Sequence, residues 1–189
     1  MKVRTWPVVG VALAVVWLFV RGVDPTATRV VEEFLIGLAV GLPLAFAFRR
    51  LAADRVDIGR AARAVPDVLR YLAVFSREVV VANVDVAYRA VAPGPPIEPE
   101  VILIPLRVQT PLGITTIANS ITITPGTITL DHDEDVNAIY VHLIDGRDPA
   151  DVVEPIRTWE DYALRIFDEE HDPADPAGEF VVSGGERRD

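Results

Sequence analysis

Few residues of this sequence are of a type that could do chemistry: it has three histidines, many carboxylates and no cysteine. Thiolate catalysis, disulfides and iron–sulfur ligation are therefore excluded. His142 and Asp145 lie on one expected strand and Asp131 ends another, so these side chains could meet across strands and hold a cation. The alternative is that His142 is an ordinary packed or solvated strand residue. We favour this alternative, so the sequence predicts no metal site and no cofactor.

The usual signatures of catalysis are also missing from the sequence. It contains no HExxH zinc helix, phosphate-binding glycine loop, dinucleotide fingerprint or nucleophile elbow. Each of these motifs holds a reactive group against a substrate at a fixed spacing. We therefore predict that the protein is not an enzyme and has no catalytic or cofactor-binding residues.

Charge is distributed unevenly along the chain. Residues 1–96 carry 12 basic and 8 acidic side chains, whereas residues 97–189 carry 6 basic and 20 acidic ones. An acidic half of this kind repels phosphates and lacks the basic surface that nucleic-acid binding needs. We therefore exclude nucleic acid as a partner.

Two apolar segments near the N-terminus predict a transmembrane helical hairpin within residues 1–50. No ionisable residue occurs from residue 6 to 20 or from residue 34 to 48. Each run is shorter than the ~20 residues that cross a bilayer, and flanking residues such as Arg21 complete the length. A cleaved signal peptide is the alternative for the first segment, and a buried hairpin of a soluble protein is the alternative for both.

Basic residues flank the outer ends of the two segments, which predicts a multi-pass membrane protein with both termini in the cytoplasm. Between the segments lie Arg21 and Arg29, and Glu32 and Glu33 are expected at the membrane edge. The flanking basic residues are Lys2, Arg4, Arg49, Arg50, Arg55, Arg60 and Arg63.

Small residues four positions apart occur in both segments, Gly10 and Ala14 in the first and Gly37 and Gly41 in the second. Such pairs let helix backbones approach closely, so these four residues are candidates for helix packing. Neither segment has a charged residue near its centre, whereas ion routes through membranes depend on buried ionisable groups. We therefore expect no ion pathway through this chain alone.

A third stretch, within residues 51–92, predicts an amphipathic helix from Pro66 to Val91. On a helical wheel its six charged residues fall in one narrow arc, and the remaining face is apolar. Because the charges balance in sign, contact with a partner protein is favoured over attraction to anionic lipid. An interfacial helix and a full membrane span remain alternatives. The candidate partner-facing residues are Phe75, Val79, Asn83 and Val86.

Residues 97–170 predict a small cytoplasmic α/β domain of order βαββα, separated from the membrane part by a proline-rich linker. Beyond it, the polar and acidic residues 171–189 predict a disordered tail. The elements expected in the domain are a strand at 101–108, a helix beginning at Pro111, strands at 127–131 and 137–145, and a helix from about Asp151 to Phe167.

The turn at Pro125 and Gly126 is expected to be structural, because proline fixes one dihedral angle and glycine supplies a positive φ. A competing interpretation pairs residues 121–124 with residues 127–130 as a tight hairpin. An L-proline at the first turn position disagrees with the turns that such hairpins need. The order helix, turn, strand is therefore favoured.

In its order of segments the sequence resembles the E subunit of the Mrp-type (Mnh) multisubunit sodium/proton antiporters, over about residues 5–170. Residues 34–37 open the second apolar segment and residues 77–85 lie in the amphipathic helix. The most specific likeness is in residues 118–131, followed by residues 139–145.

The resemblance implies an accessory subunit that supports assembly and stability of a cation/proton exchange complex, embedded in the lipid bilayer of the plasma membrane with other antiporter subunits as partners. Larger subunits, similar to the proton-pumping subunits of respiratory complex I, would carry the ions. The resemblance assigns no catalytic residue. Two alternatives remain: a related subunit of a membrane-bound hydrogenase or respiratory-type complex, and a membrane-tethered sensor or ligand-binding domain.

Overall fold

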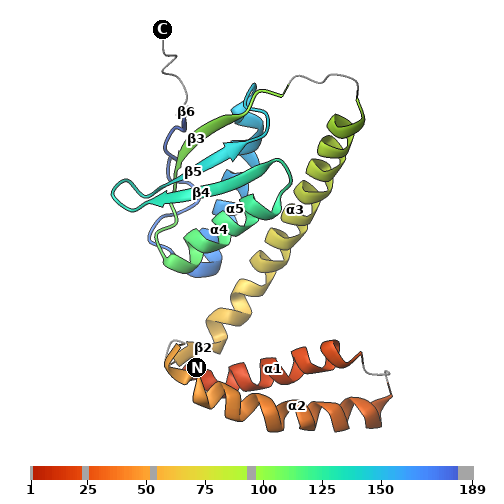
Figure 1. The fold of residues 1–189 in the computed structure, drawn as a ribbon. Coiled ribbons are helices and arrows are strands. Elements are labelled where there is room, and N and C mark those ends of the chain that lie inside the picture. The colour runs from red at the N-terminus through yellow and green to blue at the C-terminus, as the bar shows by residue number, and fades with distance from the viewer. Residues whose placement is uncertain (1, 23–25, 52–54, 93–96, 183–189) are drawn as a thin grey trace. The chain divides into compact units, whose positions relative to one another are not determined.

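The computed structural model describes residues 2–22, 26–51, 55–92 and 97–182, which form helices and two antiparallel sheets (Figure 1). This confirms the expected combination of apolar helices with a small sheet. Contacts divide the chain into two units, Met1–Arg63 and Ala64–Asp189. Each unit is described by itself.

The first unit contains a helical hairpin and a two-stranded sheet. Gly22 ends the first helix in the left-handed conformation, which glycine adopts without steric cost. The sheet is absent from the sequence-based expectation, because three-residue strands are too short to show an alternating pattern. The elements are β1 (Lys2–Arg4), α1 (Thr5–Arg21), α2 (Ala27–Ala47), the 3₁₀ helix η1 (Arg49–Leu51) and β2 (Arg55–Asp57), with β1 and β2 antiparallel.

The two helices of the hairpin differ in length. Among the described residues, α2 is the one helix that is long and apolar enough to cross a membrane, with a mean hydropathy of 1.9. Helix α1 is also apolar but has 17 residues, about 25 Å of helix against a hydrocarbon core of ~30 Å. Helix α1 is therefore somewhat shorter than the hydrocarbon core that a transmembrane helix has to cross.

Helix α3 (Ile58–Val91) begins before Pro66, where the sequence predicts its start. Alanines precede the proline and favour helix, so Pro66 lies inside the helix instead of opening it. The boundary between the two units falls between Arg63 and Ala64. The part of α3 from Ala64 onward therefore belongs with the α/β elements, whereas the sequence treats residues 51–92 as a separate segment.

The second unit is built on a four-stranded antiparallel sheet with the strand order β4-β5-β3-β6. Residues 93–96 of the expected linker lie outside the described residues. The first strand stops at Pro105, short of the expected residue 108. The strands are β3 (Glu100–Pro105), β4 (Thr127–Asp133), β5 (Ala138–Leu143) and β6 (Val181–Val182).

Helices α4 (Pro111–Ile123) and α5 (Pro149–Phe167) cover one face of this sheet (Figure 1). Alternate residues of β3 and β5 point into the same core as the apolar faces of both helices. The residues of the core with less than 2% exposure include Ile102, Ile104, Ile117, Ile121, Ile139, Val141, Leu143 and Ile156.

Local capping rules explain where α4 begins and ends. The Thr110 hydroxyl accepts a hydrogen bond of 3.2 Å from the N–H of Gly113 at the start of the helix. Because α4 runs to Ile123, the competing hairpin does not form. After the helix, Gly126 has a φ of 91°, and the Thr127 N–H donates to the Thr124 carbonyl at 3.3 Å. Glycine is therefore the residue that this turn needs.

The segment after α5 differs from the disordered tail expected for residues 171–189. Phe180 packs against the core, and β6 pairs with β3. Composition predicts disorder when a segment has few apolar side chains, but this segment is also held through its backbone carbonyls, which composition does not show. Residues 183–189 lie outside the described residues.

Candidate functional site

The four small residues of the hairpin lie at the contact between α1 and α2. Gly10, Ala14, Gly37 and Gly41 are all buried there. A Cβ atom on Gly41 would lie 2.7 Å from the Gly10 carbonyl oxygen, and one on Gly37 would lie 2.9 Å from the Ala14 Cα atom. The backbones therefore touch directly, which only small residues permit.

A polar contact closes one end of this hairpin. The Glu33 carboxylate accepts a hydrogen bond of 2.9 Å from the Trp17 indole N–H and lies 3.3 Å from the Arg21 guanidinium. Glu32 pairs instead with Arg29 on its own helix, at 3.5 Å. Glu33 is therefore engaged in holding α1 to α2 rather than free to bind a cation.

Aromatic side chains of α3 pack against the α/β elements. The Tyr71 and Ser120 hydroxyls are 2.6 Å apart, a hydrogen bond between α3 and α4. The Phe75 ring packs edge-on against Trp159 of α5, with ring centroids 5.8 Å apart. Burial raises the pKa of Tyr71, although its bond to Ser120 acts in the opposite direction. This face of α3 is therefore covered by the chain's own domain.

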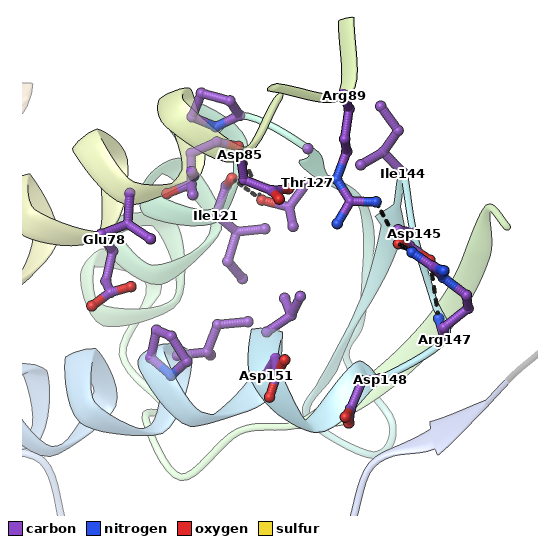
Figure 2. Close-up of a pocket in the computed structure, with 18 of the residues that line it drawn as sticks. Glu78, Asp85, Arg89, Ile121, Thr127, Ile144, Asp145, Arg147, Asp148 and Asp151 are labelled. Atoms are coloured by element: carbon purple, nitrogen blue, oxygen red, sulfur yellow. Dashed lines mark hydrogen bonds and ion pairs between the residues drawn. The ribbon is translucent and has the colours of Figure 1, made fainter. Parts of the chain in front are cut away.

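Charged side chains join the C-terminal end of α3 to the end of β5 (Figure 2). Arg89 bonds to Asp85 one turn earlier, at 2.6 Å, and also to Asp145. The Arg147 guanidinium bonds to the same carboxylate. Hydrogen bonds from Arg147 and Arg89 hold the pKa of Asp145 well below its usual range, although its partial burial acts in the opposite direction.

This arrangement contradicts the cation site considered for His142, Asp145 and Asp131. Asp145 is already bound by two guanidinium groups. Asp131 pairs across the sheet with Tyr140, and His142 pairs with Ile128, so the three side chains are not gathered. In the described ranges, no group of three histidine or carboxylate residues is placed to hold a metal ion.

A cleft of about 610 Å³ opens beside these charges, between α3 and the α4, β5 and α5 elements (Figure 2). Among the described residues that line it there is no histidine or cysteine, and its arginines are paired with carboxylates. The charged part of the described lining is therefore mostly acidic. The charged lining residues are Glu78, Asp85, Arg89, Asp145, Arg147, Asp148 and Asp151.

The opposite side of α3 presents a row of exposed apolar side chains. Leu69 and Val84 are 61% and 66% exposed, and their neighbours along the row are similar. Positions three, four, seven and eight apart share one face of a helix, so these side chains lie on one face, which the polar residues Ser76 and Asn83 interrupt. We call this surface the α3 stripe: Val65, Leu69, Leu72, Val80, Val84 and Val91.

The four predicted partner residues do not share one environment, and Val79 is half-buried. Phe75 contacts Trp159, and Val86 lies 3.7 Å from the position that a Cβ on Gly126 would take, so both face the domain. Asn83 is exposed, and its amide donates to the Val79 carbonyl at 2.7 Å. A helical wheel shows the width of an apolar arc but not which part of it the chain itself covers.

A buried ionic network links the segment just after β3 to α5, and sequence reasoning missed it. Glu160 is fully buried and accepts hydrogen bonds from the Arg107 side chain at 3.0 Å and from the Arg107 backbone N–H. Arg157 bonds to the same carboxylate at 3.1 Å. Burial lowers the pKa of Arg107, but the Glu160 and Asp161 carboxylates outweigh it and leave that pKa raised.

These features define a protein with one helix long and apolar enough to cross a membrane and with an α/β unit that presents an exposed apolar helix face. A sequence model of a family described as Na+/H+ ion antiporter subunit matches residues 10–166. The chain belongs to this family, in agreement with the resemblance found in its sequence. It is therefore a subunit of a membrane transporter.

Two curated relatives and one solved structure illustrate the similarity. The E subunit of the Na+/H+ antiporter of Alkalihalophilus pseudofirmus is 29% identical over 133 residues, covering 70% of this chain and 78% of that protein. The E1 subunit of the Na+/H+ antiporter of Staphylococcus aureus is 30% identical over 146 residues, covering 77% and 86%. A chain of an archaeal respiratory membrane complex, the membrane-bound sulfane sulfur reductase, is 28% identical with a TM-score of 0.66, covering 87% of this chain and all of that one.

Proposed function

We propose that this chain is a non-catalytic accessory subunit of a multisubunit sodium/proton antiporter, where it supports assembly and stability of the ion-translocating complex. The observation that carries this proposal is the α3 stripe. One face of α3 is covered by the chain's own domain, yet the stripe leaves about 40 Å of helix with exposed apolar side chains. An exposed apolar surface of this length indicates contact with a protein or with a membrane.

The charges of α3 favour another subunit over lipid as the occupant of the stripe. From Asp67 to Arg89 the helix carries three acidic and three basic side chains. A helix that binds an anionic membrane surface carries an excess of basic residues beside its apolar face. The balanced helix therefore fits a protein groove, with its charges turned away from the contact.

Replacing Leu69 and Val80 together with serine should reduce recovery of the partner subunits about tenfold or more. Buried apolar residues at an interface commonly contribute about 1–2 kcal/mol each, and ~1.4 kcal/mol is a factor of ten. The measurement is copurification of the other subunits with the tagged full chain from membranes. The matched control is Leu112→Ser with Ile123→Ser, since these α4 residues are 63% and 60% exposed and lie off the stripe. Equal recovery from both double variants would refute the proposed contact.

We also propose that α1 and α2 both cross the membrane, with both termini in the cytoplasm. Supporting this, the family match begins at Gly10, inside α1, which a discarded signal peptide would not share. Because the chain has no cysteine, a cysteine introduced at Thr26, between the helices, reports its side unambiguously. We expect an impermeant thiol reagent to label it from outside intact cells and to leave a cysteine at Glu170 unlabelled. The reverse pattern would overturn the orientation.

A second candidate function is supported by the match to the archaeal respiratory complex, which extends over 87% of this chain. In that case the chain would be the corresponding subunit of a respiratory-type membrane complex. The copurification experiment distinguishes the two, because the recovered partners are either antiporter subunits or subunits with redox cofactors.

A further inference from the structure

Strand β3 has one side that, within the described part of the chain, only a short segment covers. It pairs with β5 along its whole length, but on its other side just Ile102 and Leu103 pair with β6. The residues of β3 from Val101 to Ile104 are all branched and apolar, without the charge that usually protects an edge strand. Without β6, this side of β3 would be an apolar edge open to pairing.

Two arginines hold the covering segment in place through its backbone. The Arg107 guanidinium donates to the carbonyls of Pro173 and Asp175, at 3.1 and 3.3 Å. The Arg157 guanidinium donates to the Gly178 carbonyl at 2.6 Å. Both arginines are themselves bound to the buried Glu160 carboxylate. The segment is therefore fastened to the rigid centre of the domain.

Close packing supports the same placement. A Cβ atom on Gly178 would lie 2.9 Å from the Pro105 side chain, so glycine lets the segment pass directly over the end of β3. Phe180 then packs against the core, and Val181 and Val182 form the ladder. We call residues 171–182 the C-terminal strap.

The C-terminal strap lies outside the part of the chain that matches the family, which ends at residue 166. Membership of the family therefore assigns it no role. Its position does, because it occupies the one side of β3 that β5 leaves unpaired.

We propose that the C-terminal strap closes the β3 edge against pairing with the β3 edge of a second copy of this chain. Two identical apolar edges are complementary in the antiparallel sense, since across a two-fold axis each residue of one edge faces a partner on the other edge, and the reciprocal pair forms on the other side of the axis. The strap makes two ladder pairs with β3, so the hydrogen bonds from Arg107 and Arg157 contribute much of the stability of its attachment. This role goes beyond the proposed assembly function and does not depend on it.

The absence of natural cysteine makes the proposal testable by cross-linking the full chain in membranes. Single cysteines are introduced at Val101, Ile102 and Leu103 in turn, and mild oxidation then traps chains whose β3 edges meet. Each is combined with Val181→Pro, which removes the β6 pairing but keeps Arg107 and Arg157 in place. A second set ends the chain after Glu170 and removes the strap altogether.

We expect at least one position to give about tenfold more disulfide-linked dimer when the strap is unpaired or removed, since cross-strand pairs and a hydrogen-bonded anchor are lost. The double variant Leu103→Cys with Val181→Cys is the control. These residues are direct cross-strand partners, so an internal disulfide should form and the dimer should disappear. If the truncated chain does not fold, Val181→Pro decides. Equal dimer yields with the strap paired and unpaired would overturn the proposal. This result is independent of whether partner subunits copurify with the chain.

Discussion

Replacing Glu160 with alanine is expected to lower the unfolding temperature of the second unit by about 10–20 °C, because breaking a buried ion pair costs about 3–5 kcal/mol. Glu160 is fully buried, and it neutralises Arg107, which is itself only 7% exposed. The carboxylate also accepts from the backbone N–H groups of Arg107 and Val108. Alanine would therefore leave a buried guanidinium and two backbone donors with weaker partners. Thermal unfolding of the full chain in detergent, followed by circular dichroism, measures the shift.

The neighbouring residue Asp161 provides the matched control. It bonds to the same Arg107 guanidinium at 2.7 Å, but its side chain is 40% exposed. A pair of this exposure contributes about 1 kcal/mol or less, so Asp161→Ala should shift the transition by a few degrees, roughly a quarter of the effect or less. Similar shifts for the two variants would show that charge, and not burial, sets the contribution of Glu160.

Elements set by local rules could be predicted from the sequence. A threonine followed by proline marks the start of α4, and the proline–glycine turn ends the connection to β4, because both depend on neighbouring backbone angles. The small residues of α1 and α2 could likewise be identified by their spacing of four. Local signals of this kind need no knowledge of the rest of the fold.

Contacts between distant residues could not be predicted in this way. Glu160 lies between Ile156 and Ala163 on the buried side of α5, so its position hints at burial, but its partner is 53 residues away. The same limit applies to α3. The sequence shows the apolar arc of this helix. Which side of the helix contacts Trp159 and Ser120 depends on how α4 and α5 pack against it, and the sequence does not show this.

The C-terminal strap shows a third limit. Its polar composition predicts disorder because few apolar side chains are available for burial. Its carbonyls are nevertheless the acceptors for Arg107 and Arg157, and every residue type supplies a carbonyl. A segment bound through its backbone therefore leaves little trace in its own sequence. The sequence signal lies instead in the two arginines that bind the segment, Arg107 just after β3 and Arg157 within α5.

Replacing Gly41 with leucine is expected to prevent close packing of α1 against α2 and to reduce the assembled complex about tenfold or more. A Cβ atom there would lie 2.7 Å from the Gly10 carbonyl oxygen and 3.1 Å from the Leu13 side chain, so the helix backbones would have to separate. Overpacking of this kind costs about 1–3 kcal/mol, and ~1.4 kcal/mol is a factor of ten. The measurement is the amount of intact complex recovered from membranes.

The control for this change is Ala39→Leu, which adds a larger side chain to an exposed position of the same helix and should leave recovery unchanged. Sodium/proton exchange in membrane vesicles then separates a packing role from an ion-binding one. Because residues 34–48 contain no ionisable group, Gly41→Leu should lower exchange in proportion to the complex that remains, at an unaltered apparent affinity for sodium. A changed affinity at normal complex levels would mean that α2 contributes to the ion route, and the accessory role would fail.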